Sequence, residues 1–377
     1  MFFKFYRKLS SFFPVARRRV KQLSHDVKIL EDIVQIQSKE ILELQNLARK
    51  QGNIITQNVV PLLPSDINYF VGSFKKSKSI TKGNGSGKKY YIQCDRGEEY
   101  FIKLIQANDP QTVKAELAKA NSERSLMEHI ETNLQLPVLV PIDIAETSSG
   151  IYIINRWITG KTLRSLLAKT TCPRMQHELG LKAGAIIKRL HDNTIVTDKV
   201  EKKKHTKTFK KLINKMFKSY DGLETSNEET KKIAQYVINN LNISNNLPIC
   251  IVHGDLNMGN MMVDKFTSEY TLIDFWPGIR YADPLFDFRI FIFYSKYPAF
   301  LTGFVNGYTL HNPSQAFWEK VRFYSHIQLL FNIGNQGHDP KRIQRNLEHS
   351  KELLAAFGSI ENPINPPSLY LGRDPSL

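Results

Sequence analysis

The stretch from Ile249 to Trp276 constrains the fold of this 377-residue chain more than any other part of the sequence. It opens with four apolar residues, which predict a short buried strand. The triplet His-Gly-Asp follows at once, so this strand delivers the Asp255 carboxylate to its end. Two further runs, 260–264 and 270–275, predict strands joined by a five-residue polar turn. We therefore expect a buried strand, a loop that carries Asp255, and a hairpin.

The predicted hairpin places two oxygen-bearing side chains together. If it is symmetric about Thr267, Asn260 lies directly opposite Asp274, and opposed residues share a face with Cβ atoms about 5 Å apart. Mg²⁺ prefers oxygen ligands and is usually held by one or two carboxylates plus substrate phosphates. Asn260 and Asp274 are therefore candidate metal ligands. Asp255 is the candidate catalytic base, because phosphoryl transfer needs a carboxylate that orients the acceptor hydroxyl.

The same stretch resembles a known enzyme family. The runs His253-Gly-Asp-Leu-Asn-Met-Gly-Asn260, Leu272-Ile-Asp-Phe275 and Asp283-Pro-Leu-Phe-Asp287 are similar to the aminoglycoside phosphotransferase and choline kinase group. The usual family spelling has His-Pro at Asn257-Met258 and a smaller residue at Trp276, and neither departure touches the three chemical positions. The simpler alternative is a buried loop whose aspartate caps a helix and whose asparagine closes a turn.

The resemblance implies an α+β fold of the protein-kinase type, with a small antiparallel-sheet lobe, a mainly helical lobe, and ATP and Mg²⁺ as cofactors. It implies that Lys103, in the strand predicted at 99–105, pairs with nucleotide phosphates. A cation among apolar strand residues needs a buried anion. In the helix expected at about 112–133, spacing and the resemblance favour Glu123, with Glu128 as the fallback.

A glycine-rich run between the strands predicted at 69–74 and 89–93 is a candidate phosphate loop. Its glycines, Gly83, Gly85 and Gly87, would let the backbone approach phosphate oxygens. A plain flexible hairpin tip would have the same composition.

The segment from Arg156 to Gly160 follows a strand predicted at 151–155 and is similar to the family's hinge between lobes. The resemblance implies that the Arg156 carbonyl and the Ile158 amide read adenine. An ordinary strand-to-helix turn is an equally good interpretation of these residues alone.

The first 53 residues have a different character. Residues 1–19 combine aromatic residues with Lys and Arg and contain no acidic residue, which favours an anionic membrane surface. A frayed basic leader that binds nothing is the alternative. From Val20 to Ala48 apolar residues recur at a and d heptad positions, with Gln37 as the polar interruption. This predicts a coiled coil and a homo-oligomer, or else a single helix packed on its own domain.

The domains expected are 1–19 leader, 20–53 coiled-coil helix, 54–158 nucleotide-binding lobe, 159–357 catalytic and acceptor-binding lobe, and 358–377 extended tail.

Composition bounds the partners and the compartment. The net charge of +16 indicates polyanion binding or plain solubility, but no helix-turn-helix or zinc-finger pattern points to nucleic acid. The three cysteines are scattered, which is typical of a reducing compartment. No apolar run is long enough to cross a bilayer. We expect a cytoplasmic protein, peripheral at the inner face of the membrane if the leader binds lipid.

The sequence therefore predicts an ATP- and Mg²⁺-dependent phosphotransferase that acts on a small-molecule hydroxyl. From Pro284 to Phe357 eight Lys or Arg stand against five Asp or Glu, and a pocket for a polycationic antibiotic should be acidic. The acceptor expected is a sugar or a glycan or glycolipid precursor of surface polysaccharide synthesis. The alternatives are a choline or amino-alcohol kinase, and a catalytically inactive kinase-like scaffold that acts through its coiled coil.

Overall fold

The computed structural model describes residues 71, 74–81, 87–107, 109–147, 150–220, 227–244, 247–264, 266–337, 339–358 and 366–372. All of them fall within the unit Leu63–Leu377. The predicted leader, the predicted coiled coil, and the glycines Gly83 and Gly85 lie outside the described residues.

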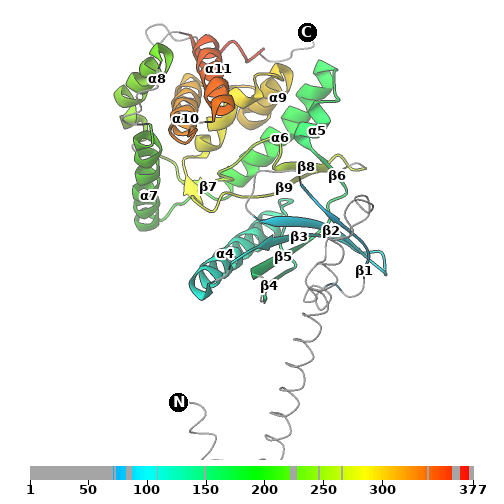
Figure 1. The fold of residues 1–377 in the computed structure, drawn as a ribbon. Coiled ribbons are helices and arrows are strands. Elements are labelled where there is room, and N and C mark those ends of the chain that lie inside the picture. The colour runs from blue at the N-terminus through cyan, green and yellow to red at the C-terminus, as the bar shows by residue number, and fades with distance from the viewer. Residues whose placement is uncertain are drawn as a thin grey trace, which may run out of the picture. The chain divides into compact units, whose positions relative to one another are not determined.

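The first part of the unit is an antiparallel sheet of five strands in the order β1-β2-β3-β5-β4 (Figure 1). The strands are β1 Phe74–Ser79, β2 Lys88–Cys94, β3 Glu99–Ile105, β4 Asp143–Thr147 and β5 Gly150–Arg156. The strand predicted at 69–74 instead begins at Phe74, and β4 was not predicted. Both lie at edges of the sheet, where strands are short and polar and alternate weakly.

Helix α4, Pro110–Leu134, follows β3 and packs against β4 and β5 (Figure 1). Its start is fixed by Asp109, whose side chain accepts a hydrogen bond from the Thr112 amide at 2.8 Å. Its end is fixed by Gln135, which adopts a left-handed conformation with φ 51°. The buried residues of the helix are Ala120, Leu126, Met127 and Ile130, and the last three belong to the larger apolar cluster, which also fills the helical part.

The second part is mainly helical, as the sequence predicted. Its helices are α5 Leu163–Leu167, α6 Pro173–Asp192, α7 Lys199–Lys218, α8 Glu228–Asn239, α9 Pro298–Thr309, α10 Gln315–Gly334 and α11 Pro340–Phe357. The helix expected after Asp283 is a 3-10 helix, Pro284–Tyr294, and α9 was not predicted. Helix α8 is capped by Asn227, which accepts from the Thr230 amide at 2.9 Å.

Short strands join the two parts. Strands β6 Gly160–Thr162, β8 Met261–Asp264 and β9 Tyr270–Leu272 form one small sheet, and β7 Cys250–Ile251 pairs with β10 Tyr281–Ala282. Each part has its own apolar cluster, and the larger one fills the helical part. Among the described helices, none has both the length and the apolar character that a membrane crossing requires.

Helices α6 and α9 touch backbone to backbone. Gly180 and Gly184 of α6 face Gly303 and Gly307 of α9, and each glycine lies against a backbone carbonyl of the other helix. A Cβ atom at Gly184 would stand 2.1 Å from the Phe304 carbonyl oxygen, which real atoms do not tolerate. The described tail residues pack on α9, where the Leu371 amide donates to Thr302 Oγ1 at 2.9 Å.

Candidate active site

The loop after β7 is held by a buried histidine. His253 is 0% exposed, and its Nε2 lies 3.0 Å from the Ile273 carbonyl oxygen. The Asp255 amide donates to its Nδ1 at 3.2 Å, which assigns the proton to Nε2. Burial lowers the pKa of His253, and the nearby charges of Asp287 and Asp255 only partly oppose that effect. His253 is therefore a neutral structural link between the loop and the chain that follows β9.

The buried carboxylate of Asp287 anchors the same loop. It accepts hydrogen bonds from the His253 and Gly254 amides, each at 2.8 Å, and lies 3.0 Å from His191 Nε2. Burial alone would raise the pKa of Asp287, but the hydrogen bond and charge of His191 outweigh it, so the pKa is lowered. The sequence interpretation of Asp287 as a structural holder and of His191 as a core histidine agrees with these contacts.

Asp255 and Asn260 meet at the open end of the loop. Asn260 Nδ2 donates to both the carbonyl oxygen and the Oδ2 atom of Asp255, each at 2.9 Å. The Asp255 side chain is exposed, whereas the neighbouring Leu256 and Gly254 are buried. This bond fixes the orientation of the carboxylate and leaves the amide oxygen of Asn260 available to another partner.

The predicted register of the hairpin is wrong by one residue. Met261 pairs with Leu272 and the Ile273 amide donates to the Asn260 carbonyl at 3.0 Å, so Asn260 faces Ile273 and not Asp274. The turn is shorter than predicted because Glu269, expected within it, already pairs across the hairpin: the Asp264 amide donates to the Glu269 carbonyl at 2.9 Å.

A one-residue shift would send the Asp274 side chain to the opposite face of the hairpin. However, β9 ends at Leu272, and Asp274 adopts a left-handed backbone with φ 56°, which changes its direction. The exposed Asp274 carboxylate is within electrostatic reach of both His253 in the loop and Glu123 on α4. Its oxygens and the amide oxygen of Asn260 belong to the donor class that Mg²⁺ prefers.

Lys103 lies in β3 as predicted, between the buried residues Ile102 and Leu104. Burial raises the pKa of Glu123 on α4, and the charge of Lys103 partly lowers it, so the two side chains are within electrostatic reach. The fallback, Glu128, instead forms an ion pair with Arg124 at 2.9 Å on the exposed side of α4. Within the described part of the chain, Lys103 and Glu123 are near each other without a direct ion pair.

The pH dependence of nucleotide affinity should follow from the raised pKa of Glu123. As the pH falls through that pKa, the carboxylate takes up a proton and Lys103 loses its anion, so affinity for an ATP analogue should fall. Glu123→Gln should bind weakly near neutral pH and lose this acid limb. Isothermal titration over about pH 5 to 8 measures it. Glu128→Gln is the matched control and should titrate like wild type. A wild-type profile in Glu123→Gln would contradict the role.

Of the remaining residues predicted to contact the nucleotide, Gly87, Arg156 and Ile158 belong to the described part of the chain. Gly87 has φ 106°, and a Cβ atom there would stand 2.5 Å from the Leu104 carbonyl oxygen, so only glycine fits this close approach to β3. The Trp157 amide donates to the Glu99 carbonyl at 2.9 Å. Ladder residues alternate in direction, so the carbonyl of Arg156 points away from β3. The half-buried Ile158 follows two residues later, before β6 begins.

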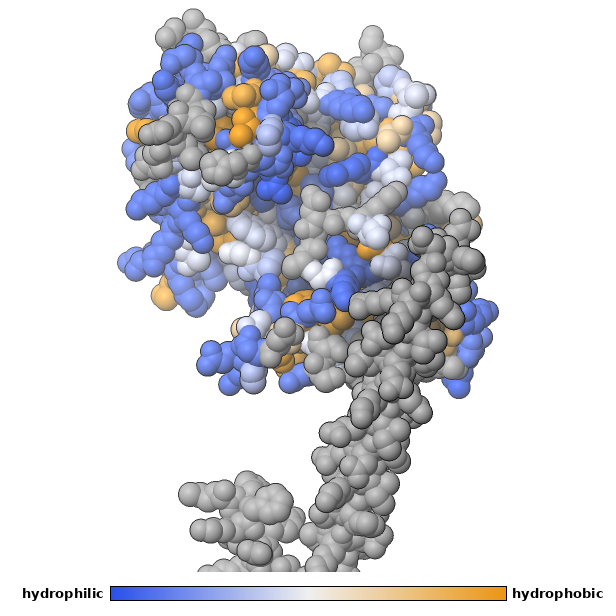
Figure 2. Space-filling model, in the orientation of Figure 1, coloured by the Kyte–Doolittle hydropathy of each residue, from blue (hydrophilic) through white to orange (hydrophobic). Residues whose placement is uncertain are grey.

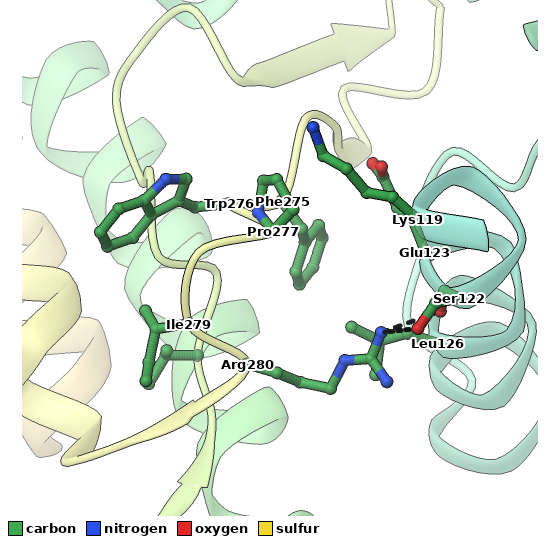
Figure 3. A pocket seen from close by; sticks show the side chains of 10 residues that line it. Lys119, Ser122, Glu123, Leu126, Phe275, Trp276, Pro277, Ile279 and Arg280 are labelled. Carbon is green, nitrogen blue, oxygen red and sulfur yellow. Dashed lines mark hydrogen bonds between the residues drawn. The ribbon is translucent and has the colours of Figure 1, made fainter. Parts of the chain in front are cut away.

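A cavity of about 250 Å³ lies between α4 and the segment after Asp274 (Figure 3). Arg280 closes one side: its Nη2 donates to the carbonyl oxygen and to Oγ of Ser122, each at 2.9 Å. Trp276 and Glu123 line the cavity as well. No sequence pattern marks Arg280 as a residue of this cavity, because its partner is 158 residues away.

Trp276, the bulky departure from the family spelling, has room because Gly254 and Gly278 lie against its side chain. A Cβ atom at Gly278 would stand 2.6 Å from the indole. The ring also stacks on Phe286, with centroids 6.5 Å apart. The bulky side chain is thus accommodated by local packing.

A two-lobed fold with this loop at the junction defines the class of kinase-like phosphotransferases. The chain belongs to the phosphotransferase enzyme family, whose model matches residues 79–324. The predicted family, fold class and enzyme class, a phosphotransferase with an alcohol group as acceptor, are confirmed. No curated protein sequence matches the chain.

Solved structures with the same fold include antibiotic phosphotransferases. A thermostable mutant of aminoglycoside phosphotransferase APH(4)-Ia aligns with TM-score 0.56 and 14% identity, over 76% of this chain and 97% of that chain. A ternary complex of that enzyme with ADP and hygromycin B gives TM-score 0.56 and 15% identity, over 77% and 96%. Macrolide 2'-phosphotransferase MphH from Brachybacterium faecium gives 0.51 and 11%, over 75% and 96%. At these identities the likeness shows the fold.

Proposed function

We propose that the protein transfers the γ-phosphoryl group of ATP, with Mg²⁺, to a hydroxyl of a sugar or of a glycan or glycolipid precursor. The observation that carries this proposal is the hydrogen-bonded pair of Asp255 and Asn260 on a loop anchored by Asp287. A loop that served only as a turn would not need a carboxylate fixed in one orientation and exposed to solvent.

Each residue has a role that its position supports. Asp255 orients the acceptor hydroxyl and takes its proton, and Asn260 keeps that carboxylate in place. Asn260 and Asp274 hold Mg²⁺, which when bound neutralises charge on the phosphates. Lys103 binds the α- and β-phosphates, and Glu123 positions Lys103.

Backbone groups complete the proposed nucleotide site. The glycine loop contacts phosphate, and the Arg156 carbonyl and Ile158 amide contact adenine. The nucleotide-binding lobe spans 54–158 and the catalytic and acceptor-binding lobe 159–357.

The charge of the helical part supports the acceptor class. Between Pro284 and Phe357 cations outnumber anions by eight to five, and the carboxylate of Asp287 is wholly buried. Few carboxylates therefore remain to bind a polycationic acceptor, whose site should be acidic. This favours a neutral or anionic sugar over an aminoglycoside, and over choline or another amino alcohol.

An acceptor screen tests the proposal. Purified protein, labelled ATP and Mg²⁺ should transfer label to a member of a sugar panel, and not to amino alcohols or nucleosides. Transfer to an amino alcohol would replace the acceptor class and keep the enzyme. No transfer or ATP hydrolysis, together with no thermal stabilisation by nucleotide, would favour the inactive scaffold.

Asp274→Asn should raise the Mg²⁺ concentration needed for half-maximal turnover by about 10- to 100-fold, because an amide is a weaker ligand than a carboxylate. Turnover is measured while Mg²⁺ is titrated at fixed ATP. Asp264→Asn is the matched control: this aspartate caps the nearby hairpin turn, accepting from the Phe266 amide at 2.7 Å. An unchanged Mg²⁺ requirement in Asp274→Asn would remove it from the metal site.

A further inference from the structure

Helix α7 concentrates positive charge to an unusual degree. Nine of its 20 residues are lysine, and Glu201 is the one acidic residue within its bounds. Figure 2 shows hydrophilic side chains gathered along the edge of the molecule where α7 lies in Figure 1. The phosphotransferase site does not use this helix, because its described residues lie in the loop after β7, in the hairpin, in β3 and in α4.

Some of these lysines form a regular row that winds slowly around the helix. Five of them recur at every fourth position, and we call this set the lysine stripe: Lys199, Lys203, Lys207, Lys211 and Lys215. All five are exposed, whereas Phe209, Ile213 and Met216 are buried. At 100° per residue the centre of the stripe is on the side opposite the buried face. The stripe therefore points away from the protein core.

This arrangement works against the helix that carries it. Like charges four residues apart on a helix repel and destabilise it. Lys204 forms an ion pair with Glu201 at 3.2 Å, and Lys204 is not part of the stripe. Solubility alone needs no such alignment, since scattered lysines give the same net charge without repulsion along one row. A partner with negative charge offsets the repulsion.

We propose that the lysine stripe is a docking surface for a membrane that contains anionic lipids. Every fourth position of a helix advances by about 40°, so the stripe winds about 160° around a helix that is about 30 Å long, and its three central members, Lys203, Lys207 and Lys211, can face one flat surface together. The cations are all lysines, and lysine acts as a point charge, whereas arginine suits the bidentate recognition that nucleic acids favour. The aromatic residues of α7 are turned inward, so bases would find no exposed ring to stack on.

Vesicle flotation of the full-length protein tests the proposal. Wild type should float with phosphatidylcholine vesicles that contain about 30% phosphatidylglycerol and not with pure phosphatidylcholine, and added salt should release it. The triple variant Lys203→Gln, Lys207→Gln, Lys211→Gln should bind the anionic vesicles about 100-fold more weakly. The basic leader is present in both proteins, so their difference reports the stripe alone.

Two further variants make the result specific. The triple variant Lys341→Gln, Arg342→Gln, Arg345→Gln on α11 removes the same charge from another exposed helix and should bind within about threefold of wild type, apart from long-range charge. The triple Lys→Arg variant of the stripe should retain vesicle binding. The glutamine variant of the stripe should keep basal ATP turnover and unfold at a slightly higher temperature, because repulsion is relieved.

Equal losses in the α7 and α11 variants would reduce the effect to net charge and overturn the proposal. Vesicle binding by the stripe variant at the wild-type level would do the same. So would stripe-dependent binding to single-stranded RNA by a protein that does not float with anionic vesicles.

Discussion

Replacing Asp255 by Ala is expected to lower kcat by about 10³-fold, the contribution typical of a positioned general base. Affinity for an ATP analogue should stay near the wild-type value, since Asp255 is assigned to the acceptor and not to the nucleotide. The fold should survive, because the side chain is exposed and its described side-chain partner is Asn260. Single-turnover kinetics with labelled ATP, together with isothermal titration, separate the two effects.

Asp192→Ala provides the control for Asp255→Ala. Asp192 is also an exposed aspartate in the helical part, and its ion pair among the described residues is with Lys188 on the surface of α6, at 2.6 Å. Loss of a surface ion pair costs little, so this variant should keep full turnover. An Asp255→Ala protein that turns over at a comparable rate would refute the assignment of the base.

The largest loss of stability should follow the replacement of Asp287 by Ala. This buried carboxylate accepts from two loop amides and lies against His191, so its removal leaves three buried polar groups without their partner. Removing one member of such a buried network costs about 3 to 5 kcal/mol. Urea unfolding followed by tryptophan fluorescence measures the loss, and kcat should fall as well because the loop is released.

Asp287→Asn refines this test. The amide keeps the shape and one acceptor oxygen, so its loss of stability should lie between those of wild type and Asp287→Ala. In wild type the lowered pKa of Asp287 predicts that protonation of this carboxylate at low pH also destabilises the fold. The stabilisation is present above the ordinary carboxyl pKa and is lost as the pH falls through the lowered value. If Asp287→Ala unfolded at the wild-type urea concentration, the anchoring role would be refuted.

Much of the fold could be predicted because local patterns were strong. Strand β3 and helix α6 occupy the predicted residues, since alternation around Lys103 and helical spacing after Pro173 are clear signals. Strand β4 and helix α9 could not be found in this way. Residues 143–147 mix polar and apolar side chains on both faces, and α9 is buried nearly all round, so neither shows a periodic pattern.

For the candidate site, the sequence indicates which residues take part but not their geometry. A short motif indicated Asp255, Asn260 and Asp274, but the hairpin register depends on which residue closes the turn. Asp264 closes it through side-chain bonds that sequence spacing does not reveal. The hydrogen bond from Arg280 to Ser122 of α4 depends on how the sheet-containing part and the helical part pack together, which local sequence patterns do not reveal.

The close contact between α6 and α9 limits how the acceptor specificity of this enzyme can be engineered. Four glycines leave no side chain there that could be trimmed, exchanged or enlarged, so the separation of the two helices is set by their main chains. Libraries meant to alter acceptor preference should therefore leave this pair untouched and vary surrounding positions. Any gain in selectivity would come from side chains elsewhere on the two helices and around them, and not from a change in the distance between α6 and α9.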